Sequence, residues 1–178
     1  MRTLIAGVGY SNLRDQSVGP IVAAQLRAEE WPAHVEVDDL SYGPVAVVHR
    51  LAEAAPPYGR LVLVGAVDRG RRGAEIHCYR WDGVLPSAEE IQARVEEAVT
   101  GVIDLDNLLV VTCHFGTLPP EVFVVEVQPV ASEFGMETSP AVAAALPEVR
   151  RLARAAAQAG AGGPGWGVAG LSVQATSR

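Results

Sequence analysis

The stretch that decides the fold is "RTLIAGVGYSNLRDQSVGP", residues 2–20. It begins with an apolar run, passes Gly7 and Gly9, and reaches Pro20 where a helix-like segment starts. A near-continuous apolar run is typical of a strand buried on both faces, and a proline near a helix N-terminus is typical of a helix start. The stretch therefore predicts a strand, a glycine-containing turn and a helix.

The rest of the chain continues this alternation. Segments rich in β-branched residues predict further strands at 34–39, 60–67, 74–81 and 121–128. Helix-like segments are 18–30, 44–55, 87–99 and 139–160, with Ser87 and Ser139 at the start of the last two and Pro147 expected to kink or divide the last one. Strands alternating with helices predict an α/β fold with three layers, α/β/α, around a mostly parallel central sheet of about five strands.

Chain length and composition bound the organisation. A chain of 178 residues is long enough for one compact domain and short for two. We expect a single α/β domain over residues 1–159. From Gly160 onward the sequence is rich in glycine and has no period, so residues 160–178 are expected to form a flexible C-terminal tail.

Charge and cysteine content exclude several classes of protein. The formal net charge of -7 argues against a nucleic-acid partner, which would require clustered Lys and Arg. The basic run at residues 68–73 is interpreted as a solvated loop. No apolar run approaches the roughly 18 residues needed to span a bilayer, so no membrane association is expected. Because the start of the chain lacks the pattern of a secretory signal and two cysteines form no disulfide framework, we expect a cytoplasmic protein with reduced thiols.

The turn after the first strand does not have the spacing of a phosphate loop. A dinucleotide fingerprint, G-x-G-x-x-G, would place a third glycine at position 12, but Asn12 stands there and the next glycine is Gly19. The Gly-Lys-Ser/Thr of a Walker A loop is also absent. In a doubly wound fold, however, the turn lies beyond the carboxyl end of the first strand, where ligands bind. It is therefore a candidate site of another kind.

The same turn resembles a known family signature, roughly G-[IV]-G-N-x-L-x-x-D-[DE]-G-[VA]-G. The matching residues are Gly7, Val8, Gly9, Leu13, Asp15, Val18 and Gly19, while Tyr10, Gln16 and Ser17 depart from it. Further matches follow in order at "VEVDDLSYG", "RLVLVGAV", "GTLPPEVFVVEVQP" and "GMETSPAV". Over about residues 1–155 the chain thus resembles the nickel-iron hydrogenase maturation endopeptidases.

The resemblance implies an activity and a partner. Endopeptidases of this family remove a C-terminal peptide from the precursor of the hydrogenase large subunit after nickel has been inserted, and they recognise that nickel with three side chains of their own. The nickel therefore belongs to the substrate, and no cofactor of the protein itself is implied with certainty. The family positions for the three metal ligands fall on Gln16, Gly65 and Gly101. An amide and two glycines cannot supply the carboxylate and imidazole ligands that suit such a metal, so the substitutions argue against the standard metal-dependent mechanism.

Two aspartates remain as candidate site residues beside Gln16. Asp15 could turn into the crevice and act with Gln16 in catalysis, or it could cap the helix that starts near Val18. Asp39 ends the second strand at the same edge, where the resemblance implies substrate binding and local sequence alone implies a turn-forming aspartate. Asp68, in the basic run, is as well explained by a surface ion pair.

His77-Cys78 and Cys113-His114 do not form a recognisable metal site. Neighbours in a strand point to opposite faces, so His77 and Cys78 cannot easily bind one ion. Neither pair has the spacing of a zinc site, and two core thiols explain the cysteines better. A G-x-S-x-G nucleophile motif is absent.

Three functions remain open at this point. The chain is an active maturation endopeptidase with a rearranged site, or a non-catalytic relative that binds a hydrogenase large subunit as an assembly factor, or a binder of a small ligand in the same crevice. The missing ligands favour the second on chemical grounds, while the resemblance favours the first.

Overall fold

The computed structural model describes residues 1–170. Along the chain its elements are β1 (Thr3–Val8), the 3₁₀ helix η1 (Arg14–Ser17), α1 (Val18–Arg27), β2 (Val35–Asp39), α2 (Pro44–Ala52), β3 (Arg60–Ala66), β4 (Ile76–Trp81), α3 (Ala88–Val99), α4 (Leu105–His114), β5 (Glu121–Val127), α5 (Pro140–Gln158) and β6 (Val168–Ala169). The strands form one six-stranded sheet in the order β2-β1-β3-β5-β4-β6. The β4–β5 pair is antiparallel and every other pair is parallel.

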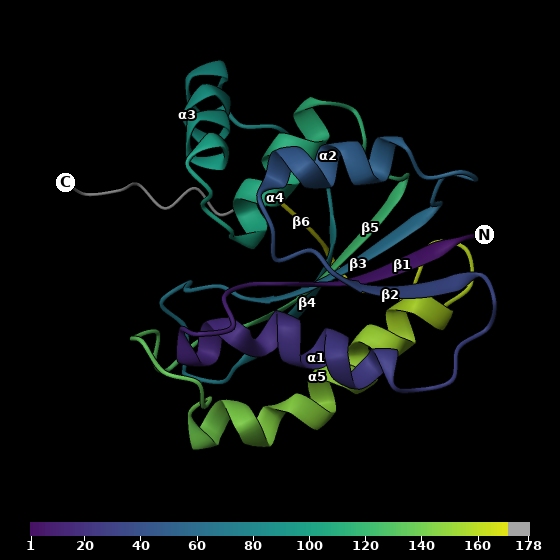
Figure 1. Cartoon of the computed structure of the whole chain (residues 1–178). Helices are drawn as coiled ribbons and strands as arrows, with labels where there is room; N and C mark the ends of the chain where they lie inside the picture. The colour runs from purple at the N-terminus through teal and green to yellow at the C-terminus, as the bar shows by residue number, and fades with distance from the viewer. Residues whose placement is uncertain (171–178) are drawn as a thin grey trace.

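Helices cover both faces of the sheet (Figure 1): α1 and α5 lie below it in that view, and α2, α3 and α4 lie above it. Alternate residues of β1 enter the two cores, with Leu4 in the core under α2 and α4 and Ile5 in the core under α1 and α5. The predicted three-layer α/β/α fold with a mostly parallel sheet is therefore confirmed, and all five predicted strands are present.

Two local features differ from the sequence expectations. Helix α4 was not among the predicted helices because it buries residues around most of its circumference and so has no single apolar stripe. Helix α5 continues through Pro147 as one helix, so of the two effects expected of this proline, a kink or a division, the division is wrong. In contrast, Ser87 and Ser139 cap α3 and α5 as expected, each accepting a hydrogen bond from a backbone N–H of the first turn.

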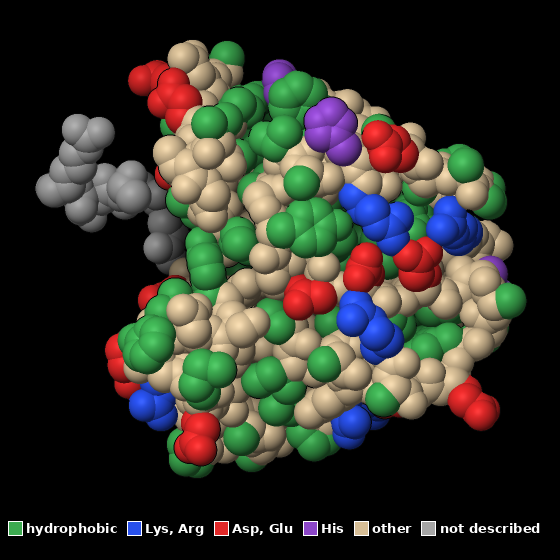
Figure 2. Space-filling model, in the orientation of Figure 1, with side chains coloured by type: hydrophobic (Ala, Val, Ile, Leu, Met, Phe, Trp, Pro, Cys, Tyr) green, Lys and Arg blue, Asp and Glu red, His purple; other side chains and the backbone are tan. Residues whose placement is uncertain are grey.

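Charged side chains protect one edge of the sheet. Along the edge strand β2, Glu36 pairs with both Arg2 and Arg50, and Asp38 pairs with Arg50 and Arg27. Figure 2 shows Arg side chains and Asp or Glu side chains lying close together over the region where β2 is drawn in Figure 1. An exposed edge strand can pair with another chain, and charged side chains of this kind prevent such pairing.

Part of the glycine-rich C-terminal stretch packs on the sheet. The fully buried Arg60 donates from Nη1 to the carbonyl of Ala159 (2.7 Å) and from Nη2 to that of Gly160 (2.8 Å) and to the carboxylate of Glu121 (2.6 Å). Trp166 packs edge-on against Phe123, and β6 pairs with β4. Residues 160–170 of the expected tail are thus held against the domain, and residues 171–178 lie outside the described part of the chain. The groups that hold this segment are mainly backbone carbonyls. The pattern of side chains in the sequence therefore gave no indication of these contacts.

Within residues 1–170, no helix combines the length and apolar character needed to cross a bilayer.

Candidate functional site

The glycines after β1 allow close packing of the chain. A Cβ on Gly7 would lie 2.1 Å from the carbonyl oxygen of Gly19, and a Cβ on Gly19 would lie 2.3 Å from the backbone of Val8. The start of α1 therefore lies directly against the end of β1, which leaves no room for side chains at either position. These two glycines serve helix–strand contact.

Three segments meet at the carboxyl edge of the parallel strands. The hydroxyl of Tyr10, just after β1, accepts a hydrogen bond from the backbone N–H of Ile103 (2.7 Å). Gly65, near the end of β3, is paired with Val8, and a Cβ on it would lie 3.2 Å from Cδ1 of Leu105 at the start of α4. The end of β1, the end of β3 and the segment before α4 are thus neighbours.

The three positions of the family's metal ligands offer little chemistry. Gln16 is half-buried in η1, and its Nε2 donates to the hydroxyl of Ser132 (3.3 Å). Gly65 has no side chain, and Gly101 lies exposed in the turn after α3 with a φ of 86°. In the described residues, nowhere do three or more His, Cys, Asp or Glu side chains group so that they could hold a metal ion.

Asp15 is fully buried and binds the segment that leads into α5. Its Oδ2 accepts hydrogen bonds from the backbone N–H groups of Val130 (2.8 Å) and Ala131 (2.9 Å). Both oxygens also bind Ser139, Oδ1 the backbone N–H (2.6 Å) and Oδ2 the hydroxyl (2.9 Å). Burial would raise the pKa of Asp15, but these hydrogen bonds outweigh it and lower the pKa below its ordinary value.

This arrangement corrects the interpretation of Asp15. The capping prediction is wrong, because Ser17 is the N-cap of α1 and no side chain caps that helix end. The carboxylate of Asp15 is also buried. It could enter the predicted crevice only if its four hydrogen bonds broke. What Asp15 does is fix the loop between β5 and α5 to η1.

Asp39 lies at the end of β2, paired with Gly7 of β1. Its Oδ1 accepts a hydrogen bond from the backbone N–H of Ser41 (3.0 Å), and the hydroxyl of Ser41 accepts one from the N–H of Gly9 (3.1 Å). The aspartate is half-buried and therefore both forms the local turn and remains at the carboxyl edge of the sheet. Its role in substrate binding stays a prediction.

A cluster of buried charges lies next to Gly65. Arg69 donates two hydrogen bonds to Asp106 (2.6 and 2.7 Å) and pairs with Glu126 (3.0 Å), which also accepts from Arg71 and Tyr79. Glu126 stands opposite Gly65 in the register of β3 and β5, and its side chain is almost completely buried. Burial would lower the pKa of Arg69, but the hydrogen bonds to Asp106 and Glu126 raise it.

The sequence interpretation missed this cluster. The basic run was expected to be a solvated loop, which is wrong for Arg69, whose side chain is nearly buried. Asp68 makes no ion pair with a described residue and instead binds Nε2 of Gln128 (2.7 Å) and the N–H of Gly70 (2.9 Å). The available signal was Glu126, a carboxylate between two valines near the end of an apolar strand, since a buried charge requires a partner.

The two cysteines do not share a site. Cys78 packs against the core under α1 and α5, whereas Cys113 packs against the core on the other face of the sheet. Both thiols are free and half-buried, and burial raises the pKa of Cys78 to about 12. The prediction that both cysteines pack with the core agrees with this placement.

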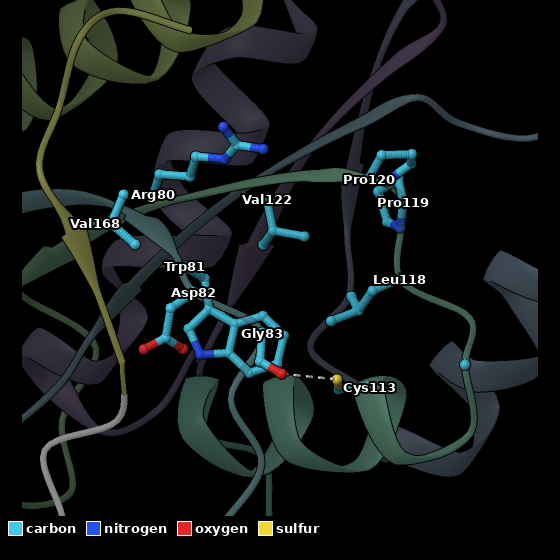
Figure 3. A pocket seen from close by; sticks show the side chains of 11 residues that line it. Arg80, Trp81, Asp82, Gly83, Cys113, Leu118, Pro119, Pro120, Val122 and Val168 are labelled. Carbon is cyan, nitrogen blue, oxygen red and sulfur yellow. Dashed lines mark hydrogen bonds between the residues drawn. The ribbon is translucent and has the colours of Figure 1, made fainter. Parts of the chain in front are cut away.

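The cavity in Figure 3 lies at the opposite end of the parallel strands, where β5 begins. It has a volume of about 410 Å³ and is lined by the end of β4, including Trp81, by Cys113 of α4 and by Leu118, Pro119 and Val122 near the start of β5. The thiol of Cys113 points toward the carbonyl of Gly83 across it. Because β5 begins here, this cavity is separate from the crevice predicted at the carboxyl edge.

Comparison with known proteins gives similarity at the level of structure. No protein-family model matches the chain, and no curated protein matches its sequence. The hydrogenase maturating endopeptidase HybD from Escherichia coli is 21% identical with a TM-score of 0.61, over 86% of this chain and 91% of that protein. The hydrogenase 2 maturation peptidase from a Thaumarchaeota archaeon is also 21% identical, with a TM-score of 0.61 over 85% and 95% of the two chains. The maturation protease HybD from Thermococcus kodakarensis is 16% identical, with a TM-score of 0.60 over 89% and 100%. The chain thus has the fold of the hydrogenase maturation endopeptidases.

Proposed function

We propose that this protein recognises a nickel-iron hydrogenase large-subunit precursor in the cytoplasm, and that it does so without the nickel-dependent cleavage typical of the fold. The observation that carries the proposal is the loss of all three ligand side chains, at Gln16, Gly65 and Gly101, on a scaffold that otherwise has the endopeptidase fold. A single substitution could be compensated by a neighbour. Three substitutions leave only an amide oxygen, a weak neutral ligand for a divalent metal.

The charges next to Gly65 support the same conclusion. Asp106 and Glu126 are the carboxylates that lie near this position, and each is bound to Arg69. A carboxylate neutralised by a guanidinium is a poor ligand, and a metal ion beside Arg69 and Arg71 would meet like charge in a poorly solvated place. The arginines would therefore have to leave before these carboxylates could replace the missing ligands.

Two other functions are retained as alternatives. Similarity of fold favours an active endopeptidase whose site is rearranged, but function argued from fold is an analogy. A small-ligand binder would use the same crevice, and Asp39 would then contact the ligand. The preferred proposal, a non-catalytic binding or assembly factor, differs from both because it requires a protein partner and no chemical step.

The decisive experiment is incubation of the protein with a nickel-loaded large-subunit precursor. Intact mass spectrometry would detect loss of the C-terminal peptide, and co-purification would detect binding. We expect binding with no change in precursor mass. Cleavage of any kind would contradict the non-catalytic proposal, and absence of binding would contradict the choice of partner.

Matched variants sharpen the binding measurement. Asp39→Asn removes the charge of Asp39 and retains an oxygen to accept the hydrogen bond from Ser41. We expect weaker precursor binding with an unchanged unfolding midpoint. Glu148→Gln, an exposed substitution on α5, serves as the control for a change of one charge elsewhere. Equal binding by the Asp39 variant and the wild type would remove Asp39 from the binding site.

A further inference from the structure

The loop between β5 and α5 exposes three large apolar side chains, Val130, Phe134 and Met136, which we call the apolar rim. Their exposed fractions are 57%, 77% and 70%. Single exposed apolar residues are ordinary, but several on one short loop are typical of an interaction surface. Aromatic residues and methionine are also enriched where proteins bind one another.

The loop that carries the apolar rim is held firmly to the body of the protein. Asp15 binds its two ends, at Val130 and Ser139. In the middle, the N–H of Gly135 donates to the carbonyl of Asn12 (2.9 Å), and the carbonyl of Gly135 accepts from the N–H of Arg14 (3.0 Å). A loop ordered in this way loses little conformational freedom on binding, so its exposed side chains are preorganised.

Gly135 lies closely against η1 and the residue before it. Gly135 forms a parallel bridge with Leu13, and a Cβ on Gly135 would lie 2.9 Å from Cγ of Arg14. Phe134 and Met136, on either side of Gly135, are both largely exposed.

The apolar rim is continuous with the candidate crevice. Ser132, on the same loop, accepts the hydrogen bond from Gln16, and Arg14 of η1 pairs with Glu133 (3.0 Å). Val130 lies beside Gly73 of the basic loop, since a Cβ on that glycine would be 2.6 Å from Cγ2 of Val130. A polypeptide that reaches Gln16 at the carboxyl edge would pass along this loop.

We infer that the apolar rim is the docking surface for an apolar segment of the precursor polypeptide, flanked on that partner by Lys or Arg. The identity of the partner rests on the proposed function. The basic flank complements Glu137, which is exposed next to Met136 and has no ion-pair partner among residues 1–170. The net charge of -7 disfavours an anionic membrane surface as the occupant.

The test compares two pairs of surface substitutions. The double variant Phe134→Ser/Met136→Ser removes the apolar rim, and the double variant Val84→Ser/Val99→Ser removes two equally exposed apolar side chains elsewhere (65% and 75% exposed). All four positions are exposed, so both variants are expected to unfold at the wild-type midpoint. Binding of each to the immobilised, nickel-loaded precursor gives the Kd.

We expect the Phe134/Met136 variant to raise Kd about tenfold or more and the Val84/Val99 variant to leave it unchanged. The single variant Glu137→Lys is also expected to raise Kd at low salt, and this effect should decrease as salt is added. If the wild type and the Phe134/Met136 variant bind the precursor with the same Kd, the docking surface is wrong while the proposed function stands. No wild-type binding would overturn both.

Two further outcomes would also overturn the inference. If the wild type sediments as a dimer and the Phe134/Met136 variant as a monomer, the apolar rim joins copies of this chain. If the wild type floats with vesicles of phosphatidylcholine and phosphatidylserine and the variant does not, the rim contacts lipid.

Discussion

Asp15 binds Ser139 with both carboxylate oxygens, one to the backbone N–H and the other to the hydroxyl. This contact joins η1 to the N-cap of α5, across most of the length of the chain. It predicts that Asp15→Asn destabilises the fold, because an amide nitrogen would face N–H donors that now have an oxygen to bind. We expect a loss of about 2–4 kcal/mol in the free energy of unfolding, measured with urea at pH 7. Glu148→Gln on the exposed face of α5 should leave the midpoint unchanged, and a similarly small effect at Asp15 would contradict a structural role.

Acid should remove the contribution of Asp15. Its pKa in the folded protein lies below the ordinary value of 3.8, so the carboxylate stabilises the fold fully above that value and loses this effect as pH falls through the lowered pKa. The difference in unfolding free energy between wild type and Asp15→Asn should therefore be constant above about pH 5 and shrink below about pH 4. Urea titrations at pH 7, 5, 4 and 3 test this. A difference that stays constant down to pH 3 would mean that the charge of Asp15 is unimportant.

Gly65 is expected to resist substitution even by alanine. Its Cβ would lie 3.0 Å from the carbonyl oxygen of Val8 and 3.2 Å from Cδ1 of Leu105, so the strand or α4 would have to move by a few tenths of an ångström. We expect Gly65→Ala to cost about 1–3 kcal/mol of stability. Restoring a carboxylate with Gly65→Asp should cost more, because the new charge would be placed beside Glu126.

Gly101→Ala provides the contrast. A Cβ there would meet nothing within 4 Å, but the φ of 86° disfavours any side chain, so we expect a cost of about 1 kcal/mol without a packing defect. Thermal and urea unfolding of both variants would measure the difference. A neutral Gly65→Ala would show that α4 adapts freely and that a ligand side chain could be restored at this position.

Arg69 is predicted to hold the buried charge cluster together. Arg69→Met would leave Asp106 and Glu126 without their main cation, and breaking a buried ion pair typically costs about 3–5 kcal/mol. Arg71→Met should cost less, since Arg71 is partly exposed and pairs with Glu126 alone. Adding Asp106→Asn and Glu126→Gln to Arg69→Met should recover part of the loss. If the triple variant is no more stable than Arg69→Met, charge imbalance is not the cause.

Gly7 and Gly19 show how far the sequence alone could reach. In the sequence Gly7 and Gly19 stand only as matches to the family signature, whereas the close contact of α1 with β1 that they allow is seen only in the structure. Arg69 had no comparable signal, because its partners lie on α4 and β5, far along the chain. The same holds for Asp15, whose local sequence suggested a helix cap while its partners are at residues 130–139.

The sequence by itself determined the alternation of strands β1 to β5 with helices α1, α2, α3 and α5, the buried character of β1, β3 and β5, and the positions of Ser87 and Ser139 as helix caps. It also placed an amide and two glycines at positions 16, 65 and 101. These features depend on residue type and on neighbours within a few positions, which periodicity and motif spacing report directly. Only the tertiary structure decided that Asp15 fixes the apolar rim, that Arg69 neutralises the carboxylates near Gly65, and that Arg60 anchors residues 159–160. Each of these depends on hydrogen bonds between groups far apart in the chain, often to backbone atoms, and such partners are chosen by packing and not by local pattern.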